Sequence, residues 1–445
     1  MIKKLLIANR GEIALRIMAS AKELGIKTVI VYSEADKNSM PVQLADEAYC
    51  IGPASPSDSY LNIPAIMTAA ELSGADAIHP GYGFLSENAR FAEIVEASGL
   101  VFIGPSPKHI QLMGNKQEAR KTMESLGVPI LPGSNGVIKR IGDARRTAEK
   151  IGYPIILKAV AGGGGRGMRI INTPVELEEN FTTAQREAYM AFGSPDLYIE
   201  KYIERAHHVE VQVIGDGKKA ISIGDRECSM QRRHQKIVEE APSPFISEET
   251  RQRMLDVVEK AATSLKLRSL VTFEFLVDQK ENFYFIEANT RIQVEHPVTE
   301  LVTWVDLIKE QILIASGGKM TTKKENLRRI GHAIEARINA EDPQTFSPSP
   351  GKIHFLFFPG GNGIRVDTAV FQGYEIPPYY DSMIAKIIAY GRTRREALRK
   401  LEVALKHTSI VGVKTNLPLL LKLFESPEFL SGNYTTRFLE EEFVW

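Results

Sequence analysis

The sequence has little cysteine, no excess of charge and no long hydrophobic run, and each shortage excludes a class of protein. Its two cysteines, Cys50 and Cys228, lie far apart without a CxxC pair, which argues against a disulfide framework or a zinc ribbon and favours a reducing compartment. Lysine plus arginine and aspartate plus glutamate both total 55, so no net field attracts nucleic acid or an acidic membrane. No stretch approaches the roughly 20 apolar residues of a membrane span, and the apolar run at residues 1–8 is too short for a signal peptide. The expectation is a cytoplasmic protein without nucleic-acid or membrane partners.

The first hundred residues alternate between strand and helix patterns. Strand patterns occupy residues 4–8, 27–32, 75–79 and 100–104, and a helix pattern occupies 12–24. This alternation predicts a parallel sheet with helices on both faces, in which ligands bind beyond the carboxyl ends of the strands. The segments 9–11 and 79–83 occupy such positions. Neither matches GxGxxG, so a nicotinamide dinucleotide is not supported.

From about residue 107 the pattern becomes a mixture of helices and strands. We expect helices at 115–126, 301–315 and 394–407, and strands at 153–160, 197–202, 209–214, 333–339 and 352–358. The helix at 301–315 should end at the pair Gly317-Gly318, because glycine is a usual helix stop. With 445 residues the chain has room for two to four domains.

A run of alternating polar residues between 285 and 296 is the clearest candidate site. If the run is extended, one face carries the polar side chains of Glu287, Asn289, Arg291, Gln293 and Glu295, and the other face is largely apolar. Acceptors, an amide and a guanidinium in register suit a site that binds a metal and a small anion together. Taken alone, the run fits a half-exposed strand equally well.

The residues before this run favour a binding site. Two strand patterns joined by the polar loop 279–282 form a hairpin signal. Asp278 then pairs with Phe283, and counting back places Glu274 opposite Glu287. Like charges opposite each other destabilise a sheet, whereas a divalent cation between them creates a site. Hard oxygen ligands suit Mg²⁺ or Mn²⁺ and offer no soft ligand for zinc.

A glycine loop follows the strand at 153–160. Lys158 and Arg166 bracket four consecutive glycines at 162–165, whose backbone N–H groups can approach phosphate oxygens where a Cβ would clash. It is not a Walker loop, because no Gly-Lys-Ser/Thr ends it. A flexible glycine turn is the alternative, and a mobile flap over nucleotide phosphates fits the flanking cations better.

Other polar residues are ambiguous when each is taken singly. The basic segment 226–236 fits either phosphate binding or a solvated face. Cys228, within it, has no base partner in the sequence and is expected to be a buried thiol. Arg337, on an alternating strand, is expected to be a structural ion-pair partner. A purely structural role is preferred, when each residue is taken singly, for Lys116, Glu200, Lys201, His208 and Glu210.

Six motifs spread along the whole chain are specific in combination. They are IANRGEIA (7–14), HPGYGFLSEN (79–88), GGGGRGM (162–168), CSMQRRHQK (228–236), NTRIQVEHPVTE (289–300) and YDSMIAK (380–386). Together they resemble the motifs of the biotin carboxylase family, which belongs to the ATP-grasp superfamily.

This resemblance implies an ATP-grasp fold that is α/β and α+β in class. Its parts are a doubly wound pre-ATP-grasp domain at 1–112, an ATP-grasp domain at 113–325 with a mobile lid at about 130–202, and a mixed C-terminal domain at 326–445. The implied reaction joins bicarbonate to the ureido nitrogen of carrier-bound biotin, with ATP hydrolysed to ADP and phosphate and carboxyphosphate as the intermediate. It is the first half-reaction of acetyl-CoA carboxylase in fatty acid synthesis. Alternatives are a subunit of another acyl-CoA or pyruvate carboxylase, another ATP-grasp carboxylate ligase, and a nucleotide-sensing regulatory subunit.

The resemblance also implies roles for particular residues. The ATP contacts are Lys116, Lys158, Gly164, Gly165, Met168, Glu200, Lys201, Ile203, His208, Gln231, His234, Glu274 and Leu276. The ligands of Mg²⁺ or Mn²⁺ are Glu274, Glu287 and Asn289. The bicarbonate pocket consists of Lys236, Arg291, Gln293, Val294 and Glu295, with Glu295 as the general base. Arg337 stabilises the biotin enolate and Tyr82 lies in the biotin pocket; the catalytic set is Arg291, Glu295, Lys236 and Arg337.

Three positions depart from the family pattern. Ala288 stands where methionine is frequent and points to the apolar side, so no mechanistic effect is expected. His207 stands where arginine is frequent and is expected to alter lid contacts. Thr436 stands where an apolar neighbour of adenine is common, which leaves that wall of the pocket undefined.

The partners follow from what is absent. The chain has no Ala-Met-Lys-Met biotin attachment sequence and no room for a carboxyltransferase. The resemblance therefore implies a separate biotin carboxyl carrier protein, carboxyltransferase subunits and a homodimer, with biotin as a carrier-bound substrate.

Overall fold

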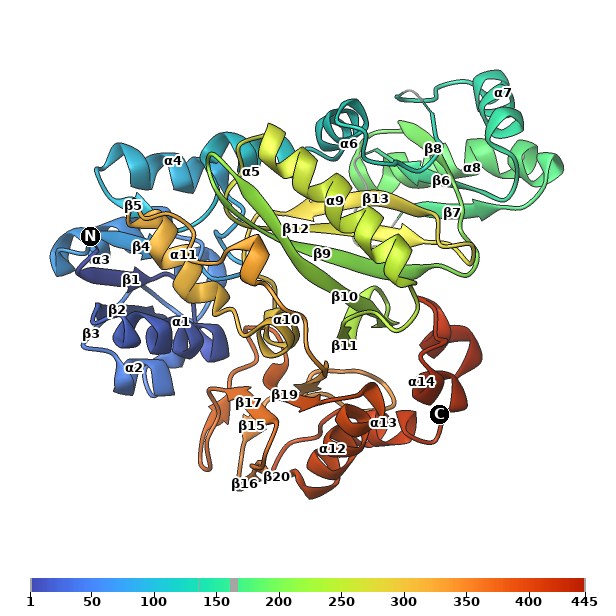
Figure 1. The fold of residues 1–445 in the computed structure, drawn as a ribbon. Coiled ribbons are helices and arrows are strands. Elements are labelled where there is room, and N and C mark those ends of the chain that lie inside the picture. The colour runs from blue at the N-terminus through green and yellow to red at the C-terminus, as the bar shows by residue number, and fades with distance from the viewer. Residues whose placement is uncertain (1, 135, 161–166, 444–445) are drawn as a thin grey trace.

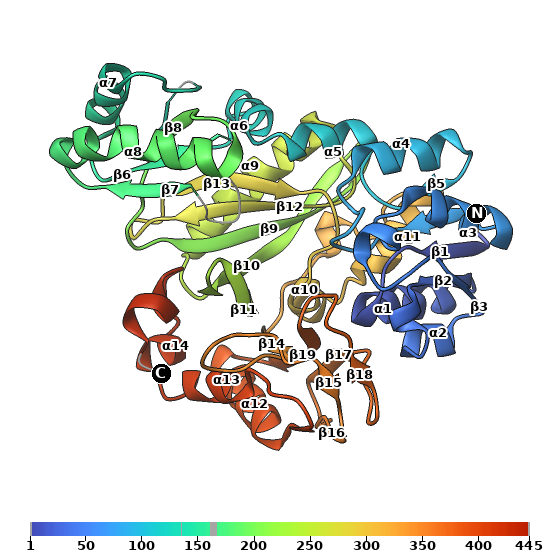
Figure 2. The same cartoon turned by 180° about the vertical axis from the view of Figure 1, so that it is seen from behind.

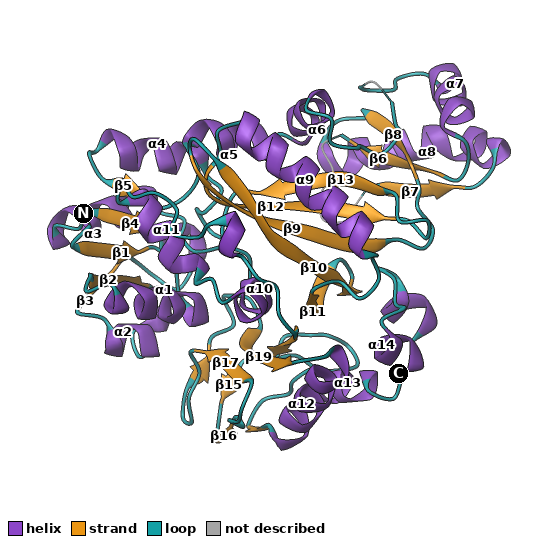
Figure 3. Cartoon of the chain, in the orientation of Figure 1, coloured by secondary structure: helices purple, strands orange, loops and turns teal. Residues whose placement is uncertain are grey.

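The computed structural model describes residues 2–134, 136–160 and 167–443. A long antiparallel sheet is surrounded by the N-terminal part, by the segment at about 130–202, which is called the lid after its expected role, and by the C-terminal part (Figures 1 and 2). Figure 3 shows that helices and strands alternate in the N-terminal part, whereas long strands dominate the centre. Among the described residues, no helix has both the length and the apolar content needed to cross a bilayer.

The N-terminal part contains the predicted parallel sheet, in the order β3-β2-β1-β4-β5. Its strands are β1 (Lys4–Ile7), β2 (Lys27–Tyr32), β3 (Glu47–Cys50), β4 (Ala77–His79) and β5 (Val101–Phe102), and its main helices are α1 (Gly11–Glu23), α2 (Met40–Leu44), α3 (Ile63–Ser73) and α4 (Ala89–Ala97). Leu5 and Ile7 join one hydrophobic cluster, and Leu6 and Ala8 join another. Both faces of β1 are therefore buried, which confirms the doubly wound sheet.

An antiparallel sheet of eight strands runs from the centre into the C-terminal part. Its order is β13-β12-β9-β10-β11-β14-β19-β17. The strands are β9 (His207–Asp216), β10 (Ala220–Arg232), β11 (Gln235–Ala241), β12 (Arg268–Val277), β13 (Phe283–Asn289), β14 (His332–Asn339), β17 (Ile364–Thr368) and β19 (Met383–Gly391). The pairing of β11 with β14 makes the sheet continuous across the predicted boundary at residue 326.

The lid is a separate small unit beside this sheet. Strands β6 (Ile155–Ala159), β7 (Met168–Ile171) and β8 (Leu197–Lys201) form an antiparallel sheet, which is covered by α7 (Ile141–Ile151) and α8 (Pro174–Phe192). Helices α5 (Pro107–Gly114) and α6 (Lys116–Ser125) lead to it from the N-terminal part. Gly164 and Gly165, to which phosphate contacts are assigned by resemblance, lie outside the described residues.

The remaining elements cover the long sheet or close the C-terminal part. They are α9 (Glu248–Ser264), α10 (His296–Thr303), α11 (Leu307–Ala315), α12 (Arg394–His407), α13 (Leu417–Leu423), α14 (Pro427–Ser431), and the short pairs β15 (Gly351–Lys352) with β18 (Glu375–Ile376) and β16 (Phe355–Phe357) with β20 (Ser409–Val411).

Two predictions of single elements are wrong. The helix expected at 301–315 is two helices, α10 and α11, because Trp304 takes the left-handed conformation (φ +59°) and the Asp306 side chain caps α11 by accepting from the N–H of Lys309 at 2.9 Å. The strand expected at 352–358 is likewise divided into β15 and β16, which pair with different partners.

Candidate active site

A cleft of about 2530 Å³ lies between the long sheet, the lid and the N-terminal part. Pockets for a single small ligand usually measure roughly 300–1,000 Å³, so this cleft has room for a nucleotide and a second substrate. Every described residue that carries a predicted role lines it. The structure thus gathers in one place residues that are up to 255 positions apart in the sequence, from Tyr82 to Arg337.

The hairpin β12–β13 builds the floor of the cleft. Glu274 lies opposite Glu287, as predicted. The pairing near the loop differs, however, because Phe283 pairs with Val277 and not with Asp278. Ile286 is an extra residue in β13, and this one-residue bulge restores the predicted register at the two glutamates.

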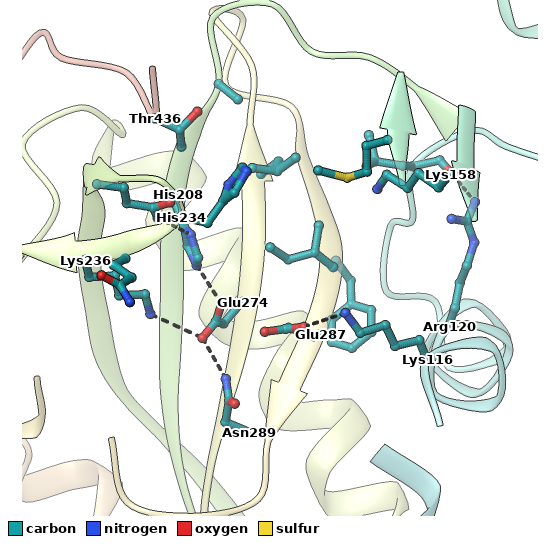
Figure 4. Close-up of a pocket in the computed structure, with 18 of the residues that line it drawn as sticks. Lys116, Arg120, Lys158, His208, His234, Lys236, Glu274, Glu287, Asn289 and Thr436 are labelled. Carbon is teal, nitrogen blue, oxygen red and sulfur yellow. Dashed lines mark hydrogen bonds and ion pairs between the residues drawn. The ribbon is translucent and has the colours of Figure 1, made fainter. Parts of the chain in front are cut away.

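Glu274 is contacted by three hydrogen-bond donors and by the imidazole of His208, and three of these four groups are labelled in Figure 4. The Nε2 of His208 lies 2.8 Å from one of its oxygens, and the other oxygen accepts from Asn289 at 2.6 Å, Gln293 at 3.1 Å and Lys236 at 3.2 Å. Burial alone would raise the pKa of this carboxyl, but the charges of Lys236 and His208 outweigh it and lower the pKa well below its usual value. Glu274 is therefore an ionised carboxylate.

Glu287 is more open than Glu274 and faces the lid side of the cleft. Its side chain is 40% exposed, and the ammonium of Lys116 lies 3.4 Å from its carboxylate (Figure 4). With Glu274 on the facing strand and Asn289 two residues along the same strand, the donors are hard oxygens. The residues present therefore fit Mg²⁺ or Mn²⁺.

The lid side of the cleft carries the cations expected to meet phosphates. Lys158 on β6 and Arg120 on α6 both pair with Glu200 on β8, the lysine at 2.5 Å. Arg120 had no motif to mark it in the sequence. The signal was its spacing, since a residue four positions after Lys116 lies on the same face of a helix. Lys201 also lines the cleft, but its Nζ donates to the carbonyls of Gly152 and Tyr153.

The side of the cleft opposite these cations is formed by β10, β12 and the C-terminal segment. The amide nitrogen of Gln231 lies 2.8 Å from Nδ1 of His208, which orients the imidazole whose Nε2 meets Glu274. Thr436 lines the cleft near His234, so the wall left undefined by the sequence carries a polar residue (Figure 4). Met168, Ile203 and Leu276 add the apolar surface.

A compact charged group lies at the far end of the floor. Strand β13 ends at Asn289, so residues 290–295 form a loop and the alternation of a strand does not continue through them. The loop still directs Arg291, Gln293 and Glu295 into the cleft, while Ile292 packs into the core. Arg291 donates to Gln293 at 2.7 Å and to Glu87 at 2.9 Å.

Glu295 lies at the centre of this group and is 1% exposed. Its two oxygens accept from different cations, Lys236 at 2.7 Å and Arg337 at 2.9 Å. Burial favours the neutral acid, yet Lys236, Arg337 and Arg226 together hold its pKa well below the usual carboxyl value. Arg337, expected from its strand alone to be only a structural partner, thus also faces the cleft.

The end of the cleft beside the N-terminal part is shaped by the loop after β4. The amide of Asn9 donates to the carbonyls of Pro80 and Tyr82, each at 2.7 Å, and so fixes the loop. Tyr82 donates its hydroxyl to Glu12 at 2.6 Å. The buried ammonium of Lys386 contacts Glu12 at 3.0 Å and donates to the carbonyl of Val294 at 2.8 Å, which ties this loop to the charged group.

Three further expectations from the sequence concern side chains that are buried in the structure. Cys228 is fully buried, which confirms the buried thiol, and burial raises its pKa. Ala288 packs in the hydrophobic core, as expected. His207 is fully buried with its ring stacked on Phe245 at 3.4 Å between centroids, and an altered lid contact at this position stays a prediction.

Three protein-family models match successive parts of the chain. They are biotin carboxylase, N-terminal domain (residues 1–110), carbamoyl-phosphate synthase L chain, ATP binding domain (115–323), and biotin carboxylase C-terminal domain (335–441).

Individual relatives agree with these models. Biotin carboxylase 1 of Bacillus subtilis is 55% identical over 99% of this chain and 98% of its own length. A crystal structure of the biotin carboxylase subunit of pyruvate carboxylase superimposes with a TM-score of 0.89 at 51% identity, over 99% of this chain and 98% of that one. A crystal structure of the biotin carboxylase domain dimer of Hydrogenobacter thermophilus 2-oxoglutarate carboxylase, in complex with MgADP, ADP and bicarbonate, superimposes with a TM-score of 0.92 at 50% identity over 99% and 98%.

Proposed function

Because the chain belongs to the biotin carboxylase family, whose members are ATP-dependent ligases with the ATP-grasp fold, we propose that it carboxylates the ureido nitrogen of biotin on a carrier protein with bicarbonate and ATP. The observation that carries this proposal is the position of Glu295 between Lys236 and Arg337, at the end of a floor that also carries Glu274 and Glu287. A base, two cations and a set of hard oxygen ligands are the groups that the reaction needs at adjacent points.

The first step is attack of bicarbonate on the γ-phosphorus of ATP. Lys116, Lys158 and Arg120 supply positive charge from the lid side, where negative charge accumulates in phosphoryl transfer. When bound, Mg²⁺ would be held by Glu274, Glu287 and Asn289 and would neutralise phosphate charge. Lys236 and Arg291 orient bicarbonate, with Gln293 and the backbone of Val294 completing the pocket.

Proton removal from bicarbonate is assigned to Glu295. An ionised carboxylate is required, and the neighbouring cations keep it ionised. Carboxyphosphate is the expected product of this step. Transfer to biotin follows at the end of the cleft near Tyr82, where Arg337 stabilises the enolate form of the ureido group.

The carboxylase to which the chain contributes is a separate proposal, because relatives are named as parts of different carboxylases. We propose the biotin carboxylase subunit of a cytoplasmic acetyl-CoA carboxylase in fatty acid synthesis, acting as a homodimer with a biotin carboxyl carrier protein and carboxyltransferase subunits. The relatives named as parts of a pyruvate carboxylase and of a 2-oxoglutarate carboxylase favour those systems as alternatives. A different ATP-grasp ligase remains a separate candidate, since the phosphate-binding groups would serve any carboxylate.

The test is ADP release from ATP and Mg²⁺, with bicarbonate and free biotin added or omitted. Stimulation by biotin that requires bicarbonate supports the proposal. Turnover with another carboxylic acid and no need for bicarbonate supports a different ligase, and ATP binding without turnover supports a regulatory subunit. Glu287→Gln serves as a matched variant, because it removes the negative charge of one proposed metal ligand and leaves Glu295 intact. It should raise the Mg²⁺ concentration needed for half-maximal activity.

A further inference from the structure

A second pair of facing glutamates lies behind the cleft, and none of the proposed roles uses it. Glu239 on β11 is directly opposite Glu335 on β14, and both side chains are fully buried. Two buried carboxylates at facing positions cannot both be charged without a large cost. The pair Glu274 and Glu287 has the same geometry, but it is served by Lys236, Lys116 and a proposed metal ion.

Cations compensate the Glu239–Glu335 pair only on the side of Glu239. None of its four oxygens accepts a well-directed hydrogen bond from the described residues. Glu239 has an ion pair with Nη2 of Arg337. The charged groups that face Glu335 from its neighbours, Lys386 on β19 and Asp367 on β17, are paired with each other and, for Lys386, with Glu12. A proton is the remaining means of removing the like-charge repulsion.

The pair lies next to the proposed base. The same Nη2 atom of Arg337 contacts both Glu239 and Glu295, so these two carboxylates are neighbours across one nitrogen. The other titratable groups near Glu239 are Lys236 on its own strand and Cys228 on β10.

We propose that Glu239 receives the proton that Glu295 removes from bicarbonate, while Glu335 stays protonated beside it. The inference rests on the proposed function. In the first transfer the O–H bond of bicarbonate breaks and the proton binds a carboxylate oxygen of Glu295. In the second transfer the same proton passes to a carboxylate oxygen of Glu239, through one side-chain rotation or one water, and Glu295 is again ionised. No electrons are exchanged with a further reactant.

The proton affinities of the two carboxyls favour this direction. Burial raises the pKa of Glu239 to about 7, although Arg337 opposes the rise, whereas the pKa of Glu295 lies well below the usual value. Burial also raises the pKa of Glu335. Protonation of Glu239 removes one of the two anionic partners of Arg337. More of the guanidinium charge then becomes available for the biotin enolate, at the point in the reaction when it forms.

The activity test compares Glu239→Gln with Glu335→Gln in the full-length enzyme. Bicarbonate-dependent ATP cleavage should rise with pH through about 7 in the wild type, because Glu239 must be ionised to accept a proton. In Glu239→Gln we expect that rise to disappear and kcat to fall about 10- to 100-fold, less than for loss of a direct general base, with KM for bicarbonate changed less than about threefold. Glu335→Gln keeps a neutral group opposite Glu239 and should retain the rise. A wild-type pH profile in Glu239→Gln, or loss of the rise in both variants, overturns the proposal.

A measurement without turnover separates this inference from the proposed function. Infrared spectra of protein labelled with ¹³C-carboxyl glutamate should show a buried carboxylic acid that ionises near pH 7 and is missing in Glu239→Gln. Absence of such a group in the wild type contradicts the inference, even if the enzyme carboxylates biotin. If the infrared signal is present but the enzyme is inactive with bicarbonate and biotin, the protonated Glu239–Glu335 pair is supported. The proposed function, and the proton transfer built on it, are then rejected.

Discussion

Substitution of Glu295 by glutamine is the most direct test of the charged group in the cleft, and the structure sets the expected loss. The two carboxylate oxygens accept from Lys236 at 2.7 Å and from Arg337 at 2.9 Å. Glutamine has one acceptor oxygen, so its amide N–H₂ would face one of the two cations. At least one hydrogen bond between charged groups is therefore lost, at a cost of about 1.5–3 kcal/mol.

The catalytic loss should be larger than this electrostatic cost. A positioned general base contributes roughly 10²- to 10⁴-fold, or about 3–5 kcal/mol of barrier. Biotin carboxylation in Glu295→Gln should fall by at least that factor. Raising the pH should not restore it, because the wild-type carboxylate is already ionised at neutral pH. Nucleotide affinity should stay within about twofold, because Glu295 has no hydrogen bond or ion pair with Lys116 or Lys158 among the described contacts.

The assay is ADP release with bicarbonate and biotin, combined with a fluorescence titration of nucleotide binding. Glu210→Gln is the matched control, since Glu210 also contacts the ammonium of Lys236 at 2.7 Å but does not pair with Arg337. Carboxylation within about fivefold of wild type in Glu295→Gln would remove Glu295 as the base. An equal loss in a folded Glu210→Gln protein would instead assign the effect to charge balance around Lys236.

Substitutions at three further positions test separate parts of the structure. Arg337→Ala should reduce carboxyl transfer to biotin more than bicarbonate-dependent ATP cleavage, and equal losses in the two assays would contradict its role at the enolate. Glu240→Gln should lower the free energy of unfolding at pH 7 by about 3 kcal/mol. Burial raises the pKa of Glu240, but the guanidinium of Arg394 at 2.7 Å outweighs burial and lowers the pKa to about 2, roughly two units below an ordinary carboxyl. A carboxyl whose pKa is lowered in the fold stabilises the folded state above about pH 4, and this stabilisation is lost as the pH falls toward 2. Denaturant titrations should therefore show the difference in unfolding free energy between Glu240→Gln and the wild type closing over that interval. A difference that is constant with pH refutes the assignment. Trp304→Gly should raise stability by about 0.5–1 kcal/mol, because a left-handed, 78% exposed tryptophan is replaced by the residue that accepts this conformation, whereas Trp304→Ala should bring no gain in thermal melting.

The hairpin shows how far counting along the chain can reach. The placement of Glu274 opposite Glu287 was correct, although the pairing near the loop was one residue out. The bulge at Ile286 compensates for that shift. A bulge depends on how side chains pack on both faces of a sheet, and alternation of polar and apolar residues does not encode it.

The helix expected at 301–315 illustrates a different limit. Its apolar spacing continues through Trp304, so the pattern predicted one helix. The break arises from the cap that Asp306 provides and from the ion pair of that residue with Arg16 on α1, at 2.8 Å. A contact between residues 290 positions apart cannot be read from a local pattern.

Most of the site residues could be predicted, but the contacts between them could not. Arg120 joins Glu200 in the lid only because α6 and β8 fold together. Lys386 reaches the carbonyl of Val294 from β19, through the core. Glu239 and Glu335 face each other because β11 pairs with β14 across the boundary expected between two domains.

The family, the doubly wound N-terminal sheet and the glutamate pair on the floor of the cleft could all be predicted from the sequence. These features depend on local periodicity and on motifs, which are properties of neighbouring residues. Which charged groups meet depends instead on the folded chain. Glu295 is held between Lys236 and Arg337, and Glu239 is left opposite Glu335, because long-range strand pairing fixes which side chains are buried together. Burial and proximity then set the ionisation of each group, and so the chemistry that each can perform.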